Sequence, residues 1–227
     1  VVRKLLKPDE ALKGAILFTA LGVLIGFYIA ACSSLHVIWI GALGVAGGSF
    51  YSAGPKSLKF MGFGDFSVFL AFGVLGALGA WTVQTASPSW LPVIWSVPIG
   101  LLIIGILHVN NWRDISGDSS LGFRSVASLL GDRASLYYYA FLIFAPYLLV
   151  VFFVFLPGST SSVPALPAWC LAVMLSLPIA FANFKKAINR HNPVNADDFV
   201  ALDGATAKLN LVFSLLFIAG ILPASSS

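Results

Sequence analysis

Two carboxylates, an arginine and two asparagines stand together in the segment Asn110–Asp118, at the end of a long apolar stretch. If this segment is helical, Asn110, Asp114 and Asp118 are four residues apart, and 3.6 residues per turn places their side chains on one face. Carboxylate and amide oxygens are the hard ligands that Mg²⁺ prefers. The spacing therefore predicts a Mg²⁺ site on Asn110, Asp114 and Asp118. Alternatively, Arg113, Asp114 and Asp118 form ordinary ion pairs at the membrane surface.

Two further segments carry cations that would surround this site if all of them lie on one side of the molecule. The connection Tyr51–Asp65 contains a helix-breaking Gly-Pro pair and carries Lys56 and Lys59 on a short tether. The segment after Asp118 carries Arg124. These side chains suit an anion, although such lysines can also serve only to anchor a loop at lipid headgroups.

The composition places these groups in a membrane protein. The chain has 227 residues, of which 59% are hydrophobic and 10% charged, and its mean hydropathy is +0.93. Such values lie outside the range of soluble domains. Apolar stretches of roughly 17–25 residues can cross a hydrocarbon core about 30 Å thick. Seven occur, at 11–31, 35–52, 66–86, 92–111, 135–156, 166–184 and 208–222, so we predict an all-α, polytopic transmembrane helical bundle with one domain over residues 1–227.

Charged residues support this count because they are confined to alternate connections. All 13 Lys and Arg residues lie at the N-terminus or in every second connection, and the connections near residues 33–35, 86–92 and 157–166 contain none. The nine acidic residues lie on the same side. By the positive-inside tendency this side faces the cytoplasm, or the stroma in a plastid. We attribute the net charge of +4 to topology and anion attraction, and we see no indication of nucleic-acid binding.

Glycine spacing predicts where helices approach one another. Gly22 and Gly26 form a small-xxx-small pair, as do Gly44 and Gly48, and such pairs favour close helix packing. Three glycines at three-residue spacing, from Gly73 to Gly79, give a smooth face that suits either a neighbouring helix or a lipid-like chain.

A few other residues have both a structural and a functional interpretation. His108 is more typical of a hydrogen-bonded interior histidine than of a ligand. Cys32 and Cys170 fall near the uncharged side of the membrane, so a disulfide is geometrically conceivable, but the sequence does not require one. In the last charged segment, Asp198 or Asp203 could add a polar contact to the predicted site.

An acidic helix end bordered by Lys and Arg at a bilayer surface suits a substrate with a diphosphate head and an apolar tail. Mg²⁺ would bridge Asp114 and Asp118 to the diphosphate. Lys56, Lys59 and Arg124 would balance the charge that grows as the carbon–oxygen bond breaks.

Three segments of the chain resemble a known family. His108–Gly131 (HVNNWRDISGDSSLGFRSVASLLG) is similar to the second aspartate motif of the UbiA superfamily of intramembrane prenyltransferases. Within it, the segment most resembles the 1,4-dihydroxy-2-naphthoate polyprenyltransferases of menaquinone and phylloquinone synthesis, with their Asn-Asn-x-Arg-Asp followed by Asp. Tyr51–Lys59 (YSAGPKSLK) and Thr206–Phe213 (TAKLNLVF) resemble other parts of the same branch, and the resemblance covers essentially the whole chain.

The resemblance implies Mg²⁺-dependent transfer of a polyprenyl group from a prenyl diphosphate to an aromatic quinone precursor, coupled to loss of the ring carboxylate. In such an enzyme the diphosphate ionises to an allylic cation that attacks the aromatic ring. The residues expected to bind Mg²⁺ and the prenyl diphosphate are Asn110, Asp114 and Asp118. The residues expected to contact the diphosphate are Lys56, Lys59 and Arg124, and Tyr51 and Arg113 are expected close to the reacting groups.

The family has nine membrane helices and two aspartate-rich motifs, and the first motif ends the second helix. Nothing like that motif occurs in this sequence, whose seven predicted spans correspond to the third through ninth. We therefore expect either that an N-terminal piece precedes Val1 or that half of the metal site has been lost.

Two functions of different class follow from the sequence. One is a quinone-precursor prenyltransferase in a bacterial inner membrane or a plastid membrane. The other is a non-catalytic membrane subunit that holds a quinone or pigment tail or packs within a larger membrane-protein complex. A transporter is disfavoured because no charge lies in the middle of a predicted span.

Overall fold

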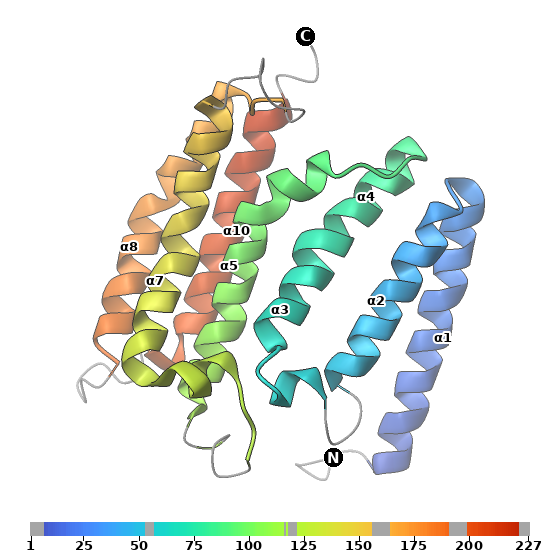
Figure 1. Cartoon of the computed structure of the whole chain (residues 1–227), viewed down its shortest axis with the longest axis horizontal. Helices are drawn as coiled ribbons and strands as arrows, with labels where there is room; N and C mark the ends of the chain where they lie inside the picture. Colours follow the sequence, from blue (N-terminus) through green and yellow to red (C-terminus); the bar gives the residue numbers. More distant parts are fainter. Residues whose placement is uncertain are drawn as a thin grey trace.

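The structure is a computed structural model that describes residues 7–52, 57–115, 117, 122–155, 164–190 and 199–222. Its described residues form a bundle of long helices without a β-sheet, which confirms the predicted all-α class (Figure 1). The long elements are α1 (Pro8–Cys32), α2 (His36–Ser52), α5 (Leu91–Arg113), α7 (Val126–Phe155) and α10 (Leu202–Ile221). Two further spans are composite: α3 (Gly64–Val68), η2 (Phe69–Leu75) and α4 (Gly76–Thr85) follow without a break, as do η3 (Ala168–Ser176) and α8 (Leu177–Ile188).

These helices are long and apolar enough to cross a bilayer. Six of them in the described part of the chain contain at least 18 residues, with mean hydropathies from 1.5 to 2.3. The remaining predicted span, 35–52, corresponds to α2, whose 17 residues lie at the lower limit for crossing the hydrocarbon core. The protein is therefore an integral, multi-pass membrane protein.

Successive helices run in opposite directions, so alternate connections gather at the same end of the bundle. Figure 1 shows α1 starting, α2 ending and α3 starting at its lower end, together with the end of α5 and the start of α7. The uncharged turns after α1 and after α4 lie at the upper end. We call the lower end the charged end, because the described Lys, Arg, Asp and Glu residues lie near the helix termini at this end, either in the connections or in the first or last turns of the helices.

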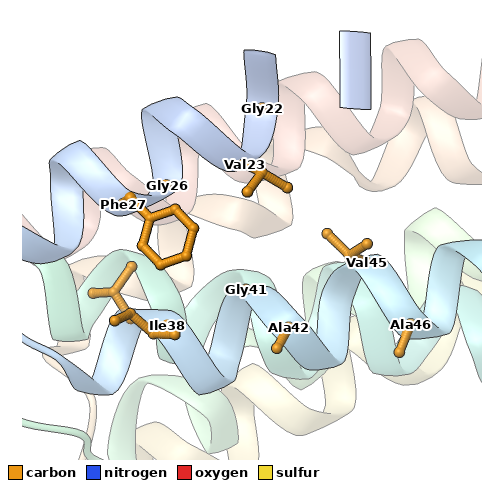
Figure 2. A pocket seen from close by; sticks show the side chains of 10 residues that line it. Gly22, Val23, Gly26, Phe27, Ile38, Gly41, Ala42, Val45 and Ala46 are labelled. Atoms are coloured by element: carbon orange, nitrogen blue, oxygen red, sulfur yellow. The ribbon is translucent and has the colours of Figure 1, made fainter. Parts of the chain in front are cut away.

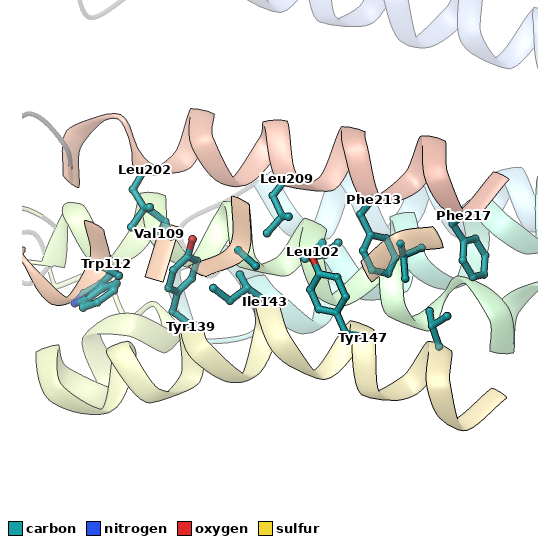
Figure 3. Close-up of a cluster of buried hydrophobic side chains, with 14 of the residues drawn as sticks. Leu102, Val109, Trp112, Tyr139, Ile143, Tyr147, Leu202, Leu209, Phe213 and Phe217 are labelled. Atoms are coloured by element: carbon teal, nitrogen blue, oxygen red, sulfur yellow. The ribbon is translucent and has the colours of Figure 1, made fainter. Parts of the chain in front are cut away.

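The largest core forms between α5, α7, α8 and α10. Side chains from α7 and α10 interdigitate along its length, among them Tyr139, Tyr147 and Phe213 (Figure 3). The buried hydroxyls in it have partners: Tyr139 hydrogen-bonds to Thr206 over 2.8 Å, and Tyr147 to Ser176 over 2.7 Å. Pairing of this kind is needed because an unsatisfied polar group in an apolar interior is costly.

Glycines set two of the closest helix contacts. Gly73 of η2 lies against Gly100 of α5, since a Cβ added at Gly73 would be 3.6 Å from the Gly100 Cα, which confirms packing for part of the Gly73–Gly79 face. Gly220 of α10 lies against η3, where an added Cβ would be only 2.6 Å from the Cα of Cys170.

The prediction of close approach at the other glycine pairs is wrong. A Cβ built at Gly22, Gly26, Gly44 or Gly48 would have no atom of a neighbouring element within 4 Å. Instead, Gly22 and Gly26 line an apolar groove of about 390 Å³ between α1 and α2 (Figure 2). Gly44 and Gly48 line a second groove of about 390 Å³, between α2 and the α3–η2 segment. A small residue permits close packing, but whether a neighbour fills the space depends on the tertiary arrangement.

Two helix boundaries differ from the prediction. Helix α7 begins at Val126, nine residues before the predicted span, and bends at Gly131, whose φ of 73° and ψ of 176° suit only glycine. Helix α10 begins at Leu202 and not at residue 208, because Leu202 and Thr206 are buried in the core and Lys208 is carried on the exposed face. The possible disulfide does not form, since Cys32 and Cys170 are both free thiols.

Candidate functional site at the charged end

The predicted site residues come from four places at the charged end. Tyr51 lies in the last turn of α2, Lys59 belongs to the short helix η1 (Leu58–Phe60), and Arg124 lies two residues before the start of α7. Asn110, Arg113 and Asp114 end α5. Lys56 and Asp118 lie outside the described residues, so their predicted roles stay predictions.

The guanidinium of Arg113 is the centre of a cluster of oxygen acceptors. It donates to the amide oxygen of Asn110, to a carboxylate oxygen of Asp114 at 3.3 Å and to one of Asp203 at 3.0 Å. It also donates to the carbonyl oxygen of Val200 at 3.3 Å. One guanidinium therefore joins the end of α5 to the start of α10, as its fork of N–H donors permits.

The register predicted for the α5 end is partly confirmed. The N–H of Asp114 donates to the carbonyl of Asn110 over 3.3 Å, so these two residues are one helical turn apart although the regular helix ends at Arg113. Part of the alternative is also observed, because Arg113 forms an ion pair with Asp114, while Asp118 lies outside the described residues; Arg113 pairs with Asp203 as well. The Asp114 side chain remains 52% exposed, so it is open to an additional partner.

The oxygen atoms of this cluster are of the type that binds a divalent cation. Oxygens of Asn110, Asp114 and Asp203 gather around one positive charge, and the two carboxylates outnumber the single guanidinium. Carboxylate and amide oxygens are the hard ligands that Mg²⁺ prefers. Within the described ranges no three His, Cys, Asp or Glu side chains group closely enough to hold a metal by themselves, so an amide oxygen or a further ligand has to take part.

Two cation-bearing loops that the sequence placed on the same side lie next to each other. Met61 and Arg124 form a parallel β-bridge, and the Arg124 N–H donates to the Phe60 carbonyl over 3.1 Å. The rings of Phe60 and Phe123 stack with centroids 3.7 Å apart, and the Lys59 ammonium lies 4.6 Å from the Phe60 ring centroid. Lys59 and Arg124 therefore lie on two loops that this bridge joins. Such an arrangement would suit an anion site with two cations.

A second network at this end was not predicted from the sequence. Asp132, one residue after the bend in α7, accepts from the indole N–H of Trp112 at 2.7 Å and pairs with Arg190 at 2.9 Å. Arg190 also donates to the Trp112 carbonyl at 2.7 Å and lies over the ring of Phe199, 4.6 Å from its centroid. Burial lowers the pKa of Arg190, and Asp132 acts in the opposite direction. This network ties together the ends of α5, α7, α8 and α10.

Three buried polar side chains at the charged end have atoms without a hydrogen-bond partner. Asp65, at the start of α3, is 4% exposed, and neither carboxylate oxygen has one. Ser57 and His108 are also buried, and the Ser57 hydroxyl and the His108 Nδ1 have none. His108 is held by its other nitrogen, which donates to the Ser135 carbonyl at 3.1 Å, as expected for an interior histidine. Buried polar groups are nearly always paired, so these atoms require an explanation.

The fold and the site define a class before any comparison: a multi-pass helical membrane protein with a cluster of carboxylate and amide oxygens and several cations at one end. Residues 1–197 match the family described as the UbiA prenyltransferase family. The chain belongs to this family.

Individual relatives cover the chain almost completely. UbiA prenyltransferase domain-containing protein 1 of Mus musculus is 30% identical over 100% of this chain and 64% of its own length, and that of Danio rerio is 34% identical over 98% and 62%. The 1,4-dihydroxy-2-naphthoate octaprenyltransferase of Bacillus subtilis is 30% identical over 98% of this chain and 68% of its own length. The chain therefore spans somewhat less than two thirds of the two animal proteins.

Proposed function

We propose that this protein transfers a polyprenyl group from a prenyl diphosphate to an aromatic quinone precursor, with 1,4-dihydroxy-2-naphthoate as the acceptor. We place the charged end on the cytoplasmic side of a bacterial inner membrane or the stromal side of a plastid membrane. Membership of the UbiA family and the similarity to a dihydroxynaphthoate octaprenyltransferase support the reaction class and the acceptor.

One observation carries the proposal. Oxygens of Asn110, Asp114 and Asp203 converge on the Arg113 guanidinium, at the end of the bundle where the loops that carry Lys59 and Arg124 are joined by the Met61–Arg124 bridge. Oxygen ligands and cations at the same end of a membrane protein suit a metal-bound diphosphate with an apolar tail.

We assign Asn110, Asp114 and Asp118 as Mg²⁺ ligands. When bound, Mg²⁺ supplies positive charge that favours departure of the diphosphate. Lys56, Lys59 and Arg124 contact the diphosphate oxygens and stabilise the charge that grows on them. We assign Tyr51, at the end of α2, a position close to the reacting groups. Arg113 holds Asn110 and Asp114 in place and keeps their charge balanced.

The second candidate is a non-catalytic subunit that binds a quinone or pigment tail. The two apolar grooves beside α2 favour it, because each presents a glycine-lined apolar surface to the membrane. A subunit of that kind would not need the carboxylates at the end of α5.

The test uses the protein expressed from its complete reading frame in membranes supplied with a prenyl diphosphate, 1,4-dihydroxy-2-naphthoate and Mg²⁺. We expect a prenylated product that disappears with EDTA and in Asp114→Ala, and that persists in the matched control Asp9→Ala at the start of α1. Absence of product from the unmodified protein, or undiminished product from Asp114→Ala, would rule out the catalytic assignment and favour the subunit.

A further inference from the structure

Asp65 is the buried acid that the proposed reaction has not used. It follows Gly64, where a Cβ would lie 3.9 Å from the Cα of Lys59 and 3.8 Å from the side chain of Leu107. The start of α3, which carries Asp65, is therefore packed against η1 and α5. Tyr51 of α2 and Tyr138 of α7 both interact electrostatically with it.

The carboxylate nevertheless has no partner in hydrogen-bond geometry. Tyr138 approaches it from α7, but neither oxygen of Asp65 has a hydrogen bond of normal distance and angle. A buried carboxyl group without hydrogen-bond partners destabilises the folded state. Such a group is expected where a ligand completes its hydrogen bonds.

His108 provides a second buried acceptor without a hydrogen-bond partner, and it contacts the same tyrosine as Asp65. Its ring meets that of Tyr138 edge to face, with centroids 4.8 Å apart, so Tyr138 links His108 to Asp65. Because Nε2 donates to the Ser135 carbonyl, Nδ1 of the neutral ring is an acceptor, and it has no donor. The Asp65 carboxylate and His108 Nδ1 are therefore both acceptors that lack a hydrogen-bond donor in good geometry.

The need for hydrogen-bond donors limits the chemical classes of ligand that could bind here. A prenyl tail offers no donor, and a diphosphate offers only further acceptors beside a negative charge. A metal ion would need a third ligand, and the described residues contain no such group of His, Cys, Asp and Glu. An aromatic molecule with two hydroxyls supplies two O–H donors, and its ring suits the aromatic side chains of Tyr138 and His108.

We propose that Asp65, with His108, binds the hydroxyl groups of the aromatic acceptor, an inference that rests on the prenyl transfer proposed above. Asp65 accepts one hydroxyl hydrogen bond and His108 Nδ1 accepts the other. A hydrogen bond to a carboxylate raises electron density on the ring that attacks the prenyl group, without a proton transfer. The short helix η1 packs against the start of α3.

The test compares the complete protein with Asp65→Asn and Asp65→Leu, using Ser176→Ala as a control for loss of a buried hydroxyl remote from the charged end. The probes are 1,4-dihydroxy-2-naphthoate and 1-hydroxy-2-naphthoate, which lacks one hydroxyl. We expect the unmodified protein to prefer the dihydroxy compound by about 10- to 100-fold in kcat/KM, since a site built for a hydroxyl rejects its absence. In both Asp65 variants this preference falls toward one, while the KM for the prenyl diphosphate is unchanged.

Two measurements without turnover accompany the kinetics. Equilibrium binding of 1,4-dihydroxy-2-naphthoate to protein in nanodiscs should weaken at least tenfold in Asp65→Leu. The Tm of ligand-free Asp65→Leu should rise or stay the same, because leucine removes an unpaired buried charge. A purely structural Asp65 would give a lower Tm with the acceptor preference intact.

The outcomes separate this inference from the proposed function. If the unmodified protein forms no product, prenyl transfer is wrong, and the binding measurement still tests Asp65. If product forms but Asp65→Asn keeps the preference of the unmodified protein between the two naphthoates, acceptor binding by Asp65 is overturned and prenyl transfer stands. Bound water would then be the hydrogen-bond partner of the Asp65 carboxylate and His108 Nδ1. An equal loss of preference in Ser176→Ala would overturn it as well.

Discussion

Replacement of Arg190 by glutamine should loosen the charged end without touching the predicted ligands. The Arg190 side chain is 16% exposed and makes a salt bridge to Asp132, a hydrogen bond to the Trp112 carbonyl and cation–π contacts with the rings of Trp112 and Phe199. These contacts come from α5, α7 and the start of α10, so one side chain joins three neighbouring segments to the end of α8.

The size of the effect follows from these contacts. The charged hydrogen bond to a carbonyl contributes about 1.5–3 kcal/mol. The two cation–π contacts contribute roughly 0.5–1 kcal/mol each. The pair with Asp132 contributes about 0–1 kcal/mol, because the Asp132 side chain is 42% exposed and solvent screens it. Glutamine recovers part of the hydrogen bonding, so we expect a loss of about 2–3 kcal/mol in the free energy of unfolding.

The assay is reversible unfolding of the complete protein in mixed detergent micelles, followed by far-UV circular dichroism. Arg133→Gln is the matched control, because Arg133 lies beside Asp132 on α7 and is exposed. We expect Arg133→Gln to remain within about 0.5 kcal/mol of the unmodified protein. Equal stability of the two variants would refute the view that Arg190 holds the helix ends together.

Three more predictions concern single positions. Gly220→Ala should lower the free energy of unfolding by about 1–3 kcal/mol, because the new methyl group meets the η3 backbone, whereas Gly204→Ala on the same helix has open space and should be neutral or stabilising in the same unfolding assay. Gly131→Ala should cost about 1–3 kcal/mol, since φ is 73° at the bend of α7, and an unchanged Tm would contradict this. Lys59→Gln and Arg124→Gln should each raise the KM for prenyl diphosphate about tenfold, with the acceptor KM unchanged, because each removes a charged contact of roughly 1.4 kcal/mol.

The helices and the charged end were predictable because they depend on local properties. Hydropathy and the placement of Lys and Arg can be read directly from the sequence. The four-residue spacing within α5 is a local relation, and Asn110 and Asp114 are indeed one helical turn apart. Lys59 and Arg124 were expected on one side, and the bridge between Met61 and Arg124 brings their loops together.

The remaining features depend on contacts between distant residues. Asp203 was considered as a polar contact to the site and does contact Arg113, but the two residues are 90 positions apart, and no spacing rule identified Arg113 as its partner. The partners Asp132 and Arg190 each appear in the sequence as an ordinary charge beside a helix. Lys208 suggested that the last span begins after it, but a lysine can extend its charged end from a helix surface while the helix continues. The unpartnered state of Asp65 is visible only when every neighbour is in place.

The central claim is tested most directly by measuring prenylated product and released diphosphate together in the same reaction. The complete protein is supplied with a prenyl diphosphate and Mg²⁺, with and without 1,4-dihydroxy-2-naphthoate. Prenyl transfer predicts one diphosphate released per prenylated product, little release without the acceptor, and loss of both products in Asp114→Ala. Diphosphate release that does not depend on the acceptor, or the absence of a prenylated product, would contradict it.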